Sequence, residues 1–216
     1  MSFALASGAE ARWTGTPGSV AVVCVNGGTA SLTPGTWSAS LEWLVGKLAV
    51  ELPELSFLEV RYRVKSWRQL ESCVEDARAA IVAAREAEAE EIVLLGFSMG
   101  GAVAVHVAAD PAVTTVVGLA PWLYADLDLT PLRGRRLAIF HGELDRGLPL
   151  IPGVSPELSL RAAQRASALG VDTARTTIPG AVHPIALRAP WGKAIPLPRG
   201  GRWVALVAAE LGRVCA

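Results

Sequence analysis

Apolar and polar residues alternate along this chain on two length scales. Three short runs are almost continuously apolar, which is typical of parallel strands buried on both faces. These runs cover 20–25, 92–96 and 113–119. Other short runs predict further strands over 57–63, 137–141 and 173–178. Elsewhere apolar side chains recur at helical spacing. The predicted helices cover 37–51, 70–84, 99–109, 156–169 and 203–214.

The alternation of strands with helices predicts βαβ units. Right-handed crossovers between parallel strands place helices on both faces of one sheet. We therefore expect an α/β fold, with a doubly wound, mainly parallel sheet of about six to seven strands. No internal repeat or linker divides the sequence, so residues 1–216 are expected to form a single domain.

Two of the predicted strands are expected towards the edges of this sheet. Over 57–63, apolar side chains alternate with Glu59, Arg61 and Arg63, whereas a central parallel strand is apolar on both faces. The strand over 173–178 is also short and more polar than the others. We place 57–63 towards one edge and 173–178 towards the other.

Composition and charge exclude several classes of protein. The 216 residues include 20 basic and 20 acidic side chains, and 51% of the residues are hydrophobic while 19% are charged. This hydrophobic excess excludes intrinsic disorder. A nucleic-acid-binding surface requires an excess of Lys and Arg, so the balanced charge argues against a nucleic acid partner.

The cysteines and the apolar runs indicate a location inside the cell. Cys24, Cys73 and Cys215 are too far apart in sequence to form a metal-ligand cluster, so no metal is expected. The N-terminus lacks the basic and apolar segments of a secretory signal. The longest apolar run, over 113–124, is too short to span a bilayer. We expect a cytoplasmic protein with no membrane partner.

The candidate chemistry centres on the string Gly96-Phe97-Ser98-Met99-Gly100. It follows an apolar run and precedes the helix that is predicted to begin at Met99. A sharp strand-to-helix turn lifts a serine hydroxyl out of the sheet, and small residues at 96 and 100 let the backbone pass close by. The positive end of the helix dipole favours negative charge that develops beside Ser98.

With this turn, the chain resembles the α/β-hydrolase superfamily over nearly its whole length. In that family an acid and then a histidine follow the serine, and the acid comes after a later strand. Here the run 141–149 is similar to the family's His-Gly-x-x-Asp-x-x-Val-Pro loop, and 179–183 to the loop that carries the histidine. The resemblance implies that Ser98 is the nucleophile, His183 the general base and Asp145 the acid that orients it.

The resemblance also implies an oxyanion hole formed by two backbone N–H groups. The first belongs to Met99, the residue after the nucleophile. The second should come from the loop after the strand over 20–25, where the family usually has His-Gly-x and this chain has Asn26-Gly27-Gly28. We assign this donor to Gly28, with Gly27 as the neighbouring alternative. The asparagine removes one familiar anchor of this loop.

The two other histidines are expected to have structural roles. His106 lies in the middle of an apolar helix and is interpreted as a hydrogen-bonded core residue. His141 ends a strand just before Gly142, and the resemblance implies that it positions the acid loop rather than reacting.

The active site is expected to be open or shallow. Only residues 120–136 separate two successive strands at the point where many members of the superfamily insert a lid, and this length is too short for a helical cap domain. A site without a cap favours small, soluble esters over long-chain triglycerides.

Loops after the strands carry the candidate substrate-binding residues. In a parallel sheet such loops gather at the carboxyl edge, where ligands bind. The candidates in these loops are Trp122, Leu148 and Trp191. The irregular stretch 190–198 is expected to border the pocket through Trp191. Further candidates for the same wall are Trp37, Trp67 and Leu123. The alternative for each tryptophan is that it only covers a helix end.

These features predict a small, lidless serine esterase that cleaves small-molecule carboxylic esters through an acyl-enzyme. It is similar to carboxylesterases and to dienelactone-hydrolase-like proteins, although the latter usually have Cys where this chain has Ser98. Two alternatives stay open: another acyl hydrolase or transferase (a thioesterase, amidase or peptidase) with the same triad, and a non-catalytic ligand-binding protein. No phosphate loop, zinc ligand set or dinucleotide fingerprint is present, so no cofactor is expected.

Overall fold

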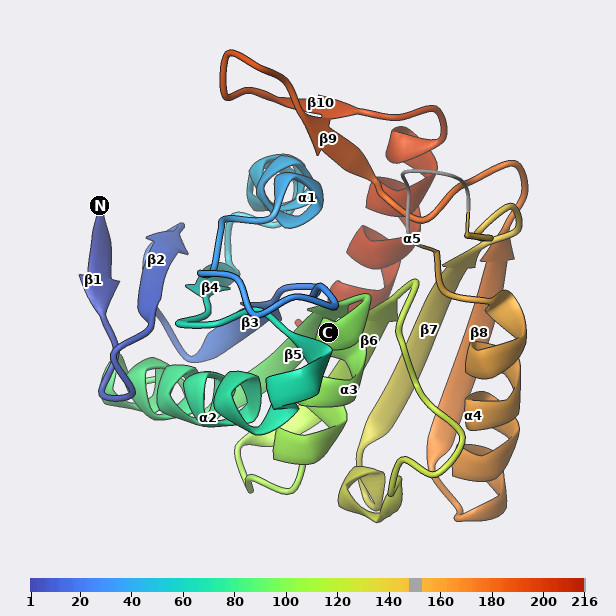
Figure 1. Cartoon of the computed structure of the whole chain (residues 1–216). Helices are drawn as coiled ribbons and strands as arrows, with labels where there is room; N and C mark the ends of the chain where they lie inside the picture. Colours follow the sequence, from blue (N-terminus) through green and yellow to red (C-terminus); the bar gives the residue numbers. More distant parts are fainter. Residues whose placement is uncertain (148–152, 216) are drawn as a thin grey trace.

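The computed structural model describes residues 1–147 and 153–215, which form an eight-stranded sheet and a two-stranded hairpin (Figure 1). The strands of the sheet are β1 Ser2–Ala4, β2 Glu10–Thr14, β3 Val20–Val25, β4 Ser56–Arg61, β5 Glu91–Phe97, β6 Val113–Leu119, β7 Arg136–Gly142 and β8 Asp172–Ile178. From β4 through β3, β5, β6 and β7 to β8, neighbouring strands are parallel. β2 and β1 extend the sheet antiparallel beyond β4.

Helices cover both faces of this sheet. Within the described residues they are α1 Ala39–Glu51, α2 Leu70–Glu86, α3 Met99–Val107, α4 Pro156–Ala168 and α5 Gly200–Leu211. Helices α2, α3 and α4 contribute to the core on one face, and α1 and α5 to the core on the other (Figure 1). The doubly wound, mainly parallel arrangement confirms the predicted fold class, which is that of the α/β-hydrolases.

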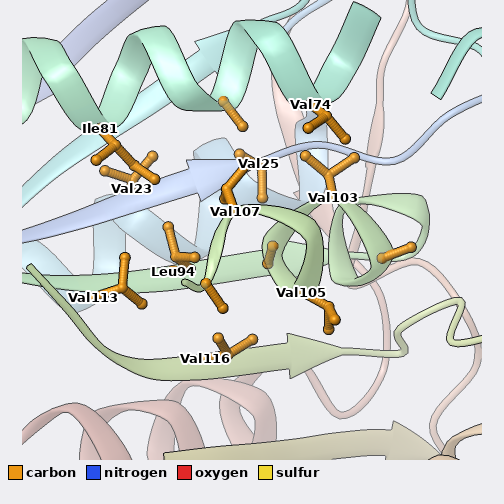
Figure 2. Close-up of a cluster of buried hydrophobic side chains, with 14 of the residues drawn as sticks. Val23, Val25, Val74, Ile81, Leu94, Val103, Val105, Val107, Val113 and Val116 are labelled. Atoms are coloured by element: carbon orange, nitrogen blue, oxygen red, sulfur yellow. The ribbon is translucent and has the colours of Figure 1, made fainter. Parts of the chain in front are cut away.

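Successive residues of the central strands point into two separate cores. In β3, Val23 and Val25 belong to the core under α2 and α3, whereas Val22 and Cys24 belong to the core under α1 and α5. Figure 2 shows the first core, where side chains of α2 and α3 lie beside Leu94 of β5. Because both faces of β3 and β5 are covered, these strands must be apolar at every position, and this pattern made them visible in the sequence.

The number of strands and the position of β4 correct the prediction. β8 is an edge strand as expected, but β4 is third from the other edge because β2 and β1 lie beyond it. Glu59 on β4 is only 3% exposed and pairs with Arg12 on β2. The alternation of charge along β4 therefore reflects a cross-strand ion pair rather than an edge that faces solvent. β1 and β2 are short and partly polar, so apolar periodicity did not reveal them.

The stretch over 190–198 was expected to be irregular, but it belongs partly to a hairpin. β9 (Ala186–Arg188) pairs antiparallel with β10 (Ala194–Pro196), and both strands pack against α1 (Figure 1). This hairpin follows the loop after β8 and lies at the same end of the molecule as α1. It therefore adds a wall beyond the sheet that the strand pattern did not predict.

No cap domain covers the sheet within the described residues, as the sequence predicted. Between β6 and β7 the chain forms loops and one short 3-10 helix, η2 (Thr130–Leu132). A second 3-10 helix, η1 (Trp67–Gln69), leads into α2. Among the helices of residues 1–147 and 153–215, none has both the length and the apolar character needed to cross a membrane.

Two helical glycines provide a test of how closely the backbone packs at the start of α3. A Cβ atom at Gly100 would overlap the carbonyl oxygen of Val25, whereas a Cβ at Gly46 in α1 would meet no atom within 4 Å. We expect Gly100→Ala to lower the free energy of unfolding by about 2 kcal/mol or more. Gly46→Ala should raise it by about 0.5–1 kcal/mol, because alanine loses less conformational entropy in a helix.

Urea unfolding of the two variants beside the wild type measures both effects. Each replacement adds one methyl group to a helix, so Gly46→Ala is the matched control. Equal changes in the two variants would contradict the close backbone approach at Gly100.

Candidate active site

Ser98 occupies a strained turn between β5 and α3. Its backbone has φ 55° and ψ −120°, a left-handed conformation that residues other than glycine rarely adopt. The turn is possible because a Cβ at Gly96 would overlap the Gly100 carbonyl oxygen, so only glycine lets the strand and helix approach. The N–H of Ser98 donates to Leu119 O at 2.9 Å. This geometry agrees with the predicted nucleophile elbow and directs the hydroxyl away from the sheet.

The structure brings Ser98, His183 and Asp145 together. The Oγ atom of Ser98 lies 3.0 Å from Nε2 of His183, and Nδ1 of His183 lies 2.7 Å from Oδ2 of Asp145. An ionised carboxylate only accepts hydrogen bonds, so Nδ1 carries the proton of a neutral ring and Nε2 accepts from the serine hydroxyl. All three residues follow the carboxyl ends of strands: β5, β7 and β8. The arrangement can abstract a proton from Ser98.

Asp145 is a buried charge that is held by several donors. Its side chain is 0% exposed. Oδ1 accepts the N–H of Val154 at 2.8 Å, while Oδ2 faces both His183 and His141. Burial alone would raise the pKa of the Asp145 carboxyl, but hydrogen bonds from His141 and His183 outweigh it and keep the pKa below the ordinary value. The carboxylate therefore stays ionised beside His183.

His141 holds the acid loop from behind. It is fully buried, and its Nε2 lies 3.0 Å from both Val154 O and Asp145 Oδ2. Both neighbours are acceptors, so Nε2 carries the proton. Within the described residues, Nδ1 has no hydrogen-bond partner, as expected for the bare nitrogen of a neutral ring. These contacts agree with the positioning role expected for His141.

His106 is hydrogen-bonded and lies outside the site as expected, but it is not the core residue that the sequence predicted. Its Nε2 lies 3.2 Å from the hydroxyl of Tyr124, and its side chain is half-buried rather than part of the core. It does not border the cavity beside Ser98 in the described residues.

The loop after β3 is anchored by the asparagine that replaces the family's histidine. Asn26 Oδ1 accepts the N–H of Gly27 at 2.7 Å, and its Nδ2 donates to Thr36 O at 3.0 Å. Tyr62 Oη donates to the Asn26 carbonyl at 3.1 Å. Within the described residues, the N–H of Gly28 has no acceptor, and that of Met99 has none either. The side chain of Met99 packs so closely on Gly28 that a Cβ there would overlap its sulfur.

A cavity of about 690 Å³ opens over Ser98 and His183. Three tryptophans line it, and Trp122 is joined to the elbow because its backbone N–H donates to the carbonyl oxygen of Ser98 at 2.8 Å. The ring centroid of Trp67 lies 6.4 Å from that of Trp122. Trp37 lines the cavity from the segment between β3 and α1. These three residues lie at the cavity where an aromatic wall was expected, and their contact with a substrate stays a prediction.

Two other residues that were predicted for this wall, Trp191 and Leu123, lie elsewhere. Trp191 is 76% exposed at the turn of the β9–β10 hairpin and does not line the cavity, so its prediction is wrong. The hairpin borders the cavity instead through residues 186–188 of β9. Leu123 is buried in the core under α3, and Leu148 lies outside the described residues.

Sequence reasoning missed several residues that line the cavity. Lys65 follows β4 at the same sheet edge, and Arg188 comes from the hairpin. Gly153 and Val154 border the cavity beside the acid loop. The position of Lys65 just after a parallel strand was a signal that the sequence contained, whereas nothing in the pattern indicated the hairpin.

Comparison with known proteins assigns the family. Residues 61–184, more than half of the chain, match the family model described as serine aminopeptidase, S33. This segment contains Ser98, Asp145 and His183. The chain belongs to this family. It is thus a hydrolase of the α/β-hydrolase superfamily. No curated protein matches its sequence.

Solved structures share the fold of this S33-family chain. An esterase/lipase from an uncultured bacterium is 18% identical, with a TM-score of 0.71 over 99% of this chain and 83% of the other. An α/β serine hydrolase homologue from Coxiella burnetii is 19% identical, with a TM-score of 0.64 over 100% and 96%. A monoacylglycerol lipase from Paleococcus ferrophilus is 16% identical, with a TM-score of 0.62 over 94% and 98%.

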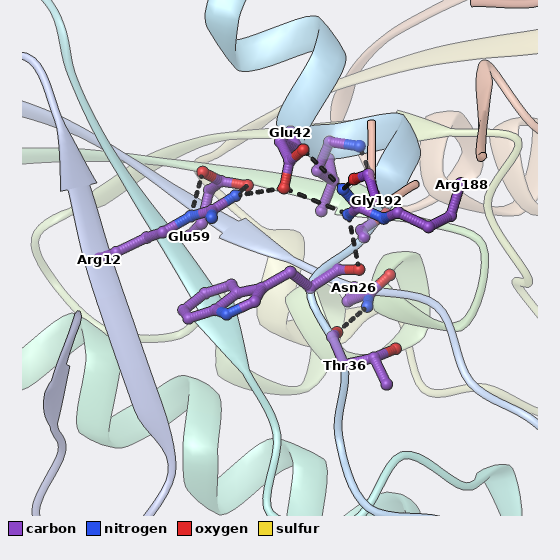
Figure 3. A network of polar contacts seen from close by, with 10 residues as sticks. Arg12, Asn26, Thr36, Glu42, Glu59, Arg188 and Gly192 are labelled. Atoms are coloured by element: carbon purple, nitrogen blue, oxygen red, sulfur yellow. Dashed lines mark hydrogen bonds and ion pairs between the residues drawn. The ribbon is translucent and has the colours of Figure 1, made fainter. Parts of the chain in front are cut away.

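An ion-pair network fixes one wall of the cavity in this S33-family hydrolase (Figure 3). Arg12 donates to Glu59 at 2.9 Å and to Glu42 at 3.0 Å. Glu42 on α1 also accepts from Arg188 on the hairpin at 2.7 Å. The guanidinium of Arg12 lies 4.4 Å from the ring centroid of Trp37. The network therefore joins strands β2 and β4, helix α1, the hairpin and an aromatic cavity residue.

Removing Arg12 should destabilise the protein in a pH-dependent way. Burial raises the pKa of the Glu59 carboxyl, and Arg12 opposes this rise. Arg12→Met leaves an unpaired buried carboxylate and should lower the free energy of unfolding by about 3 kcal/mol at pH 7. Without Arg12, the pKa of Glu59 in the folded state rises further above its value in the unfolded chain. The loss of unfolding free energy should therefore be small below about pH 4, where Glu59 is protonated in both states, and should grow as the pH rises towards neutrality.

Urea unfolding of the Arg12→Met variant between acidic and neutral pH measures this effect. Arg78→Met is the matched control, because Arg78 and Glu71 form an exposed pair and such pairs stabilise little. Adding Glu59→Gln to Arg12→Met should restore part of the loss. A deficit that does not change with pH would contradict the role assigned to Glu59.

Proposed function

We propose that this protein is a serine esterase that hydrolyses small carboxylic esters through a Ser98 acyl-enzyme. The observation that carries the proposal is the continuous hydrogen-bond chain from Asp145 through His183 to Ser98, which ends at an open cavity. A buried carboxylate, an oriented imidazole and a strained serine are the parts that acyl transfer needs. A protein that only bound ligands would not need all three.

The steps follow from these contacts. Ser98 Oγ attacks the acyl carbon while His183 Nε2 takes its proton. The imidazolium is stabilised by Asp145, and it returns the proton to the alcohol oxygen as the carbon–oxygen bond breaks. A water molecule, activated by the same nitrogen, then attacks the acyl-enzyme. Its proton passes through His183 back to Ser98 as the acid leaves.

Two backbone N–H groups are proposed to stabilise the oxyanion. Met99 supplies one, because its N–H starts α3 without an acceptor in the described part of the chain. Gly28 supplies the other. The N–H of Gly27 already donates to Asn26 Oδ1, which favours Gly28 over Gly27. Asn26 thus replaces the family's histidine as the anchor that keeps this loop in place.

The cavity supports small esters rather than peptides with a free amino end. The family description names an aminopeptidase, and such an enzyme would have to bind a protonated α-amine. A buried or half-buried ammonium needs a carboxylate partner. None of the described residues that line the cavity is acidic. The aromatic walls and a volume of about 690 Å³ suit a small apolar acyl or alcohol group.

Ester turnover that depends on Ser98 tests the proposal. We expect hydrolysis of p-nitrophenyl acetate and butyrate at neutral pH, with less activity on the octanoate. Ser98→Ala should lower kcat/KM by about 10⁴-fold or more, and Asp145→Asn by about 10⁴-fold because His183 then adopts the wrong tautomer. Ser167→Ala, an exposed serine on α4, is the matched control and should behave as wild type.

Equal rates for the wild type and Ser98→Ala would overturn the esterase proposal. The same enzymes are then measured with aminoacyl p-nitroanilides and with acyl thioesters. Turnover of either class that depends on Ser98, without turnover of esters, would assign the triad to a peptidase or a thioesterase.

A further inference from the structure

Lys65 lines the same cavity as Ser98 and is held at three points. It follows β4, and its backbone N–H donates to Thr33 O at 3.0 Å. Its carbonyl accepts from Thr29 Oγ1 at 3.0 Å. The ammonium group donates to Thr36 Oγ1 at 2.7 Å. Lys65 and Thr36 both line the cavity, so the side chain has a defined place on its wall.

The ammonium of Lys65 has no acidic partner in the described residues. No ion pair includes it there, and no carboxylate lines the cavity. The other long cationic side chain on the wall, Arg188, is paired with Glu42. Residues 148–152 lie beyond the described part but contain only Leu, Pro and Ile, so their side chains carry no acid.

This unpaired charge is costly in a partly enclosed site. The side chain is half-buried, and burial lowers the pKa of Lys65 with no neighbouring charge to oppose it. Elsewhere in the described chain, the half-buried cations Arg12 and Arg136 have carboxylate partners. The half-buried guanidinium groups of Arg165 and Arg175 have none, but each donates to several backbone or hydroxyl oxygens and neither lines the cavity. A cation that is left unpaired on the wall of a cavity is the arrangement expected when a ligand supplies the counter-charge.

Hydrogen bonds connect Lys65 to the loop beside the proposed nucleophile, Ser98. Thr36, which accepts from Lys65, also accepts from Asn26 Nδ2 through its carbonyl. Asn26 in turn holds Gly27 in the loop beside Ser98. Trp67, two residues after Lys65, extends the aromatic wall towards Trp122. A ligand in this cavity therefore meets an apolar wall and one cation that has no carboxylate partner among the described residues.

We propose that Lys65 binds an anionic group of the substrate, so that the enzyme prefers esters that carry a carboxylate in addition to the scissile bond. This proposal rests on the esterase function proposed above and names its substrate class. The anion can belong to the acyl part or to the alcohol part of the ester. In both cases the recognised chemistry is a carboxylate on a small, mainly apolar molecule.

Two pairs of esters that differ in charge test the proposal and distinguish these sources. Mono-p-nitrophenyl glutarate and p-nitrophenyl pentanoate place the difference on the acyl side. Para-acetoxybenzoate and its methyl ester place it on the alcohol side. We expect wild-type kcat/KM for the charged member of at least one pair to exceed that of the neutral member by roughly tenfold or more.

Variants of Lys65 then test whether this residue causes the preference for the charged ester. Lys65→Met should reduce the charged-to-neutral ratio to near one, mainly by raising KM for the charged ester, and Lys65→Arg should keep most of the preference. Lys47→Met removes an exposed lysine of α1 that does not line the cavity, so its ratio should equal that of wild type. Added salt should weaken the preference in wild type but not in Lys65→Met.

Failure of this proposal is distinguishable from failure of the esterase function. If neutral esters are hydrolysed with dependence on Ser98 but the ratio is near one in wild type, or is unchanged in Lys65→Met, Lys65 does not select an anion and the esterase function stands. If no ester is hydrolysed, calorimetric titration of glutarate into Ser98→Ala decides the question. Binding that Lys65→Met abolishes would support the anion site, and absence of binding would overturn it.

Discussion

The close approach of three backbone segments at Ser98 is the constraint on which the site depends. Gly96 and Gly100 let β5 turn directly into α3, and Gly100 also packs on the carbonyl of Val25 at the end of β3. Ser98 is held there in a left-handed conformation, which stores about 1–3 kcal/mol of strain. The packed sheet supplies the restraint. The close packing at Gly96 and Gly100 thus determines the positions of Ser98, the start of α3 and the loop after β3.

Backbone hydrogen bonds carry this constraint into the rest of the cavity. The carbonyl of Ser98 accepts from Gly101 and from Trp122, so the first turn of α3 and an aromatic wall residue are placed by the same atom. Asp145 and His183 follow the neighbouring strands β7 and β8, which run parallel to β5. Because parallel strands end at one edge, the loops that carry the three polar side chains lie side by side, and contacts with His141 and Val154 hold the acid loop in place.

Some charged side chains around the cavity have partners of opposite charge or hydrogen-bond donors, and one has no carboxylate partner in the described residues. Asp145 is buried but satisfied by three donors, and Glu59 is buried but paired with Arg12, so both charges are compatible with a dry interior. Asp145 holds Nδ1 of His183. Glu59 is linked through Arg12 and Glu42 to α1 and the hairpin. Lys65 is the contrasting case, because it lines the cavity and its ammonium has no carboxylate partner in the described residues. Ion pairs therefore join the segments of one wall, and the proposed anion site is the cation that has no carboxylate partner in the described residues.

The sequence alone determined the fold class, the central strands and the three residues of the candidate triad. Parallel strands that are covered on both faces must be apolar throughout, and the Gly-x-Ser-x-Gly turn needs small residues at fixed positions, so both features are local in the sequence. The resemblance of the loops over 141–149 and 179–183 to those of the α/β-hydrolases, each just after a predicted strand, grouped Asp145 and His183 with Ser98.

Only the tertiary structure decided the features that depend on contacts between distant segments. Glu59 looked like an exposed edge residue until β2 supplied Arg12, which lies 47 positions away. Trp191 followed a strand like the other tryptophans, but the β9–β10 turn carries it away from the cavity. The proposal for Lys65 rests on the observation that none of the described carboxylates pairs with its ammonium group. Pairing, exposure and the absence of a partner are properties of three-dimensional proximity, and no local pattern of residues encodes them.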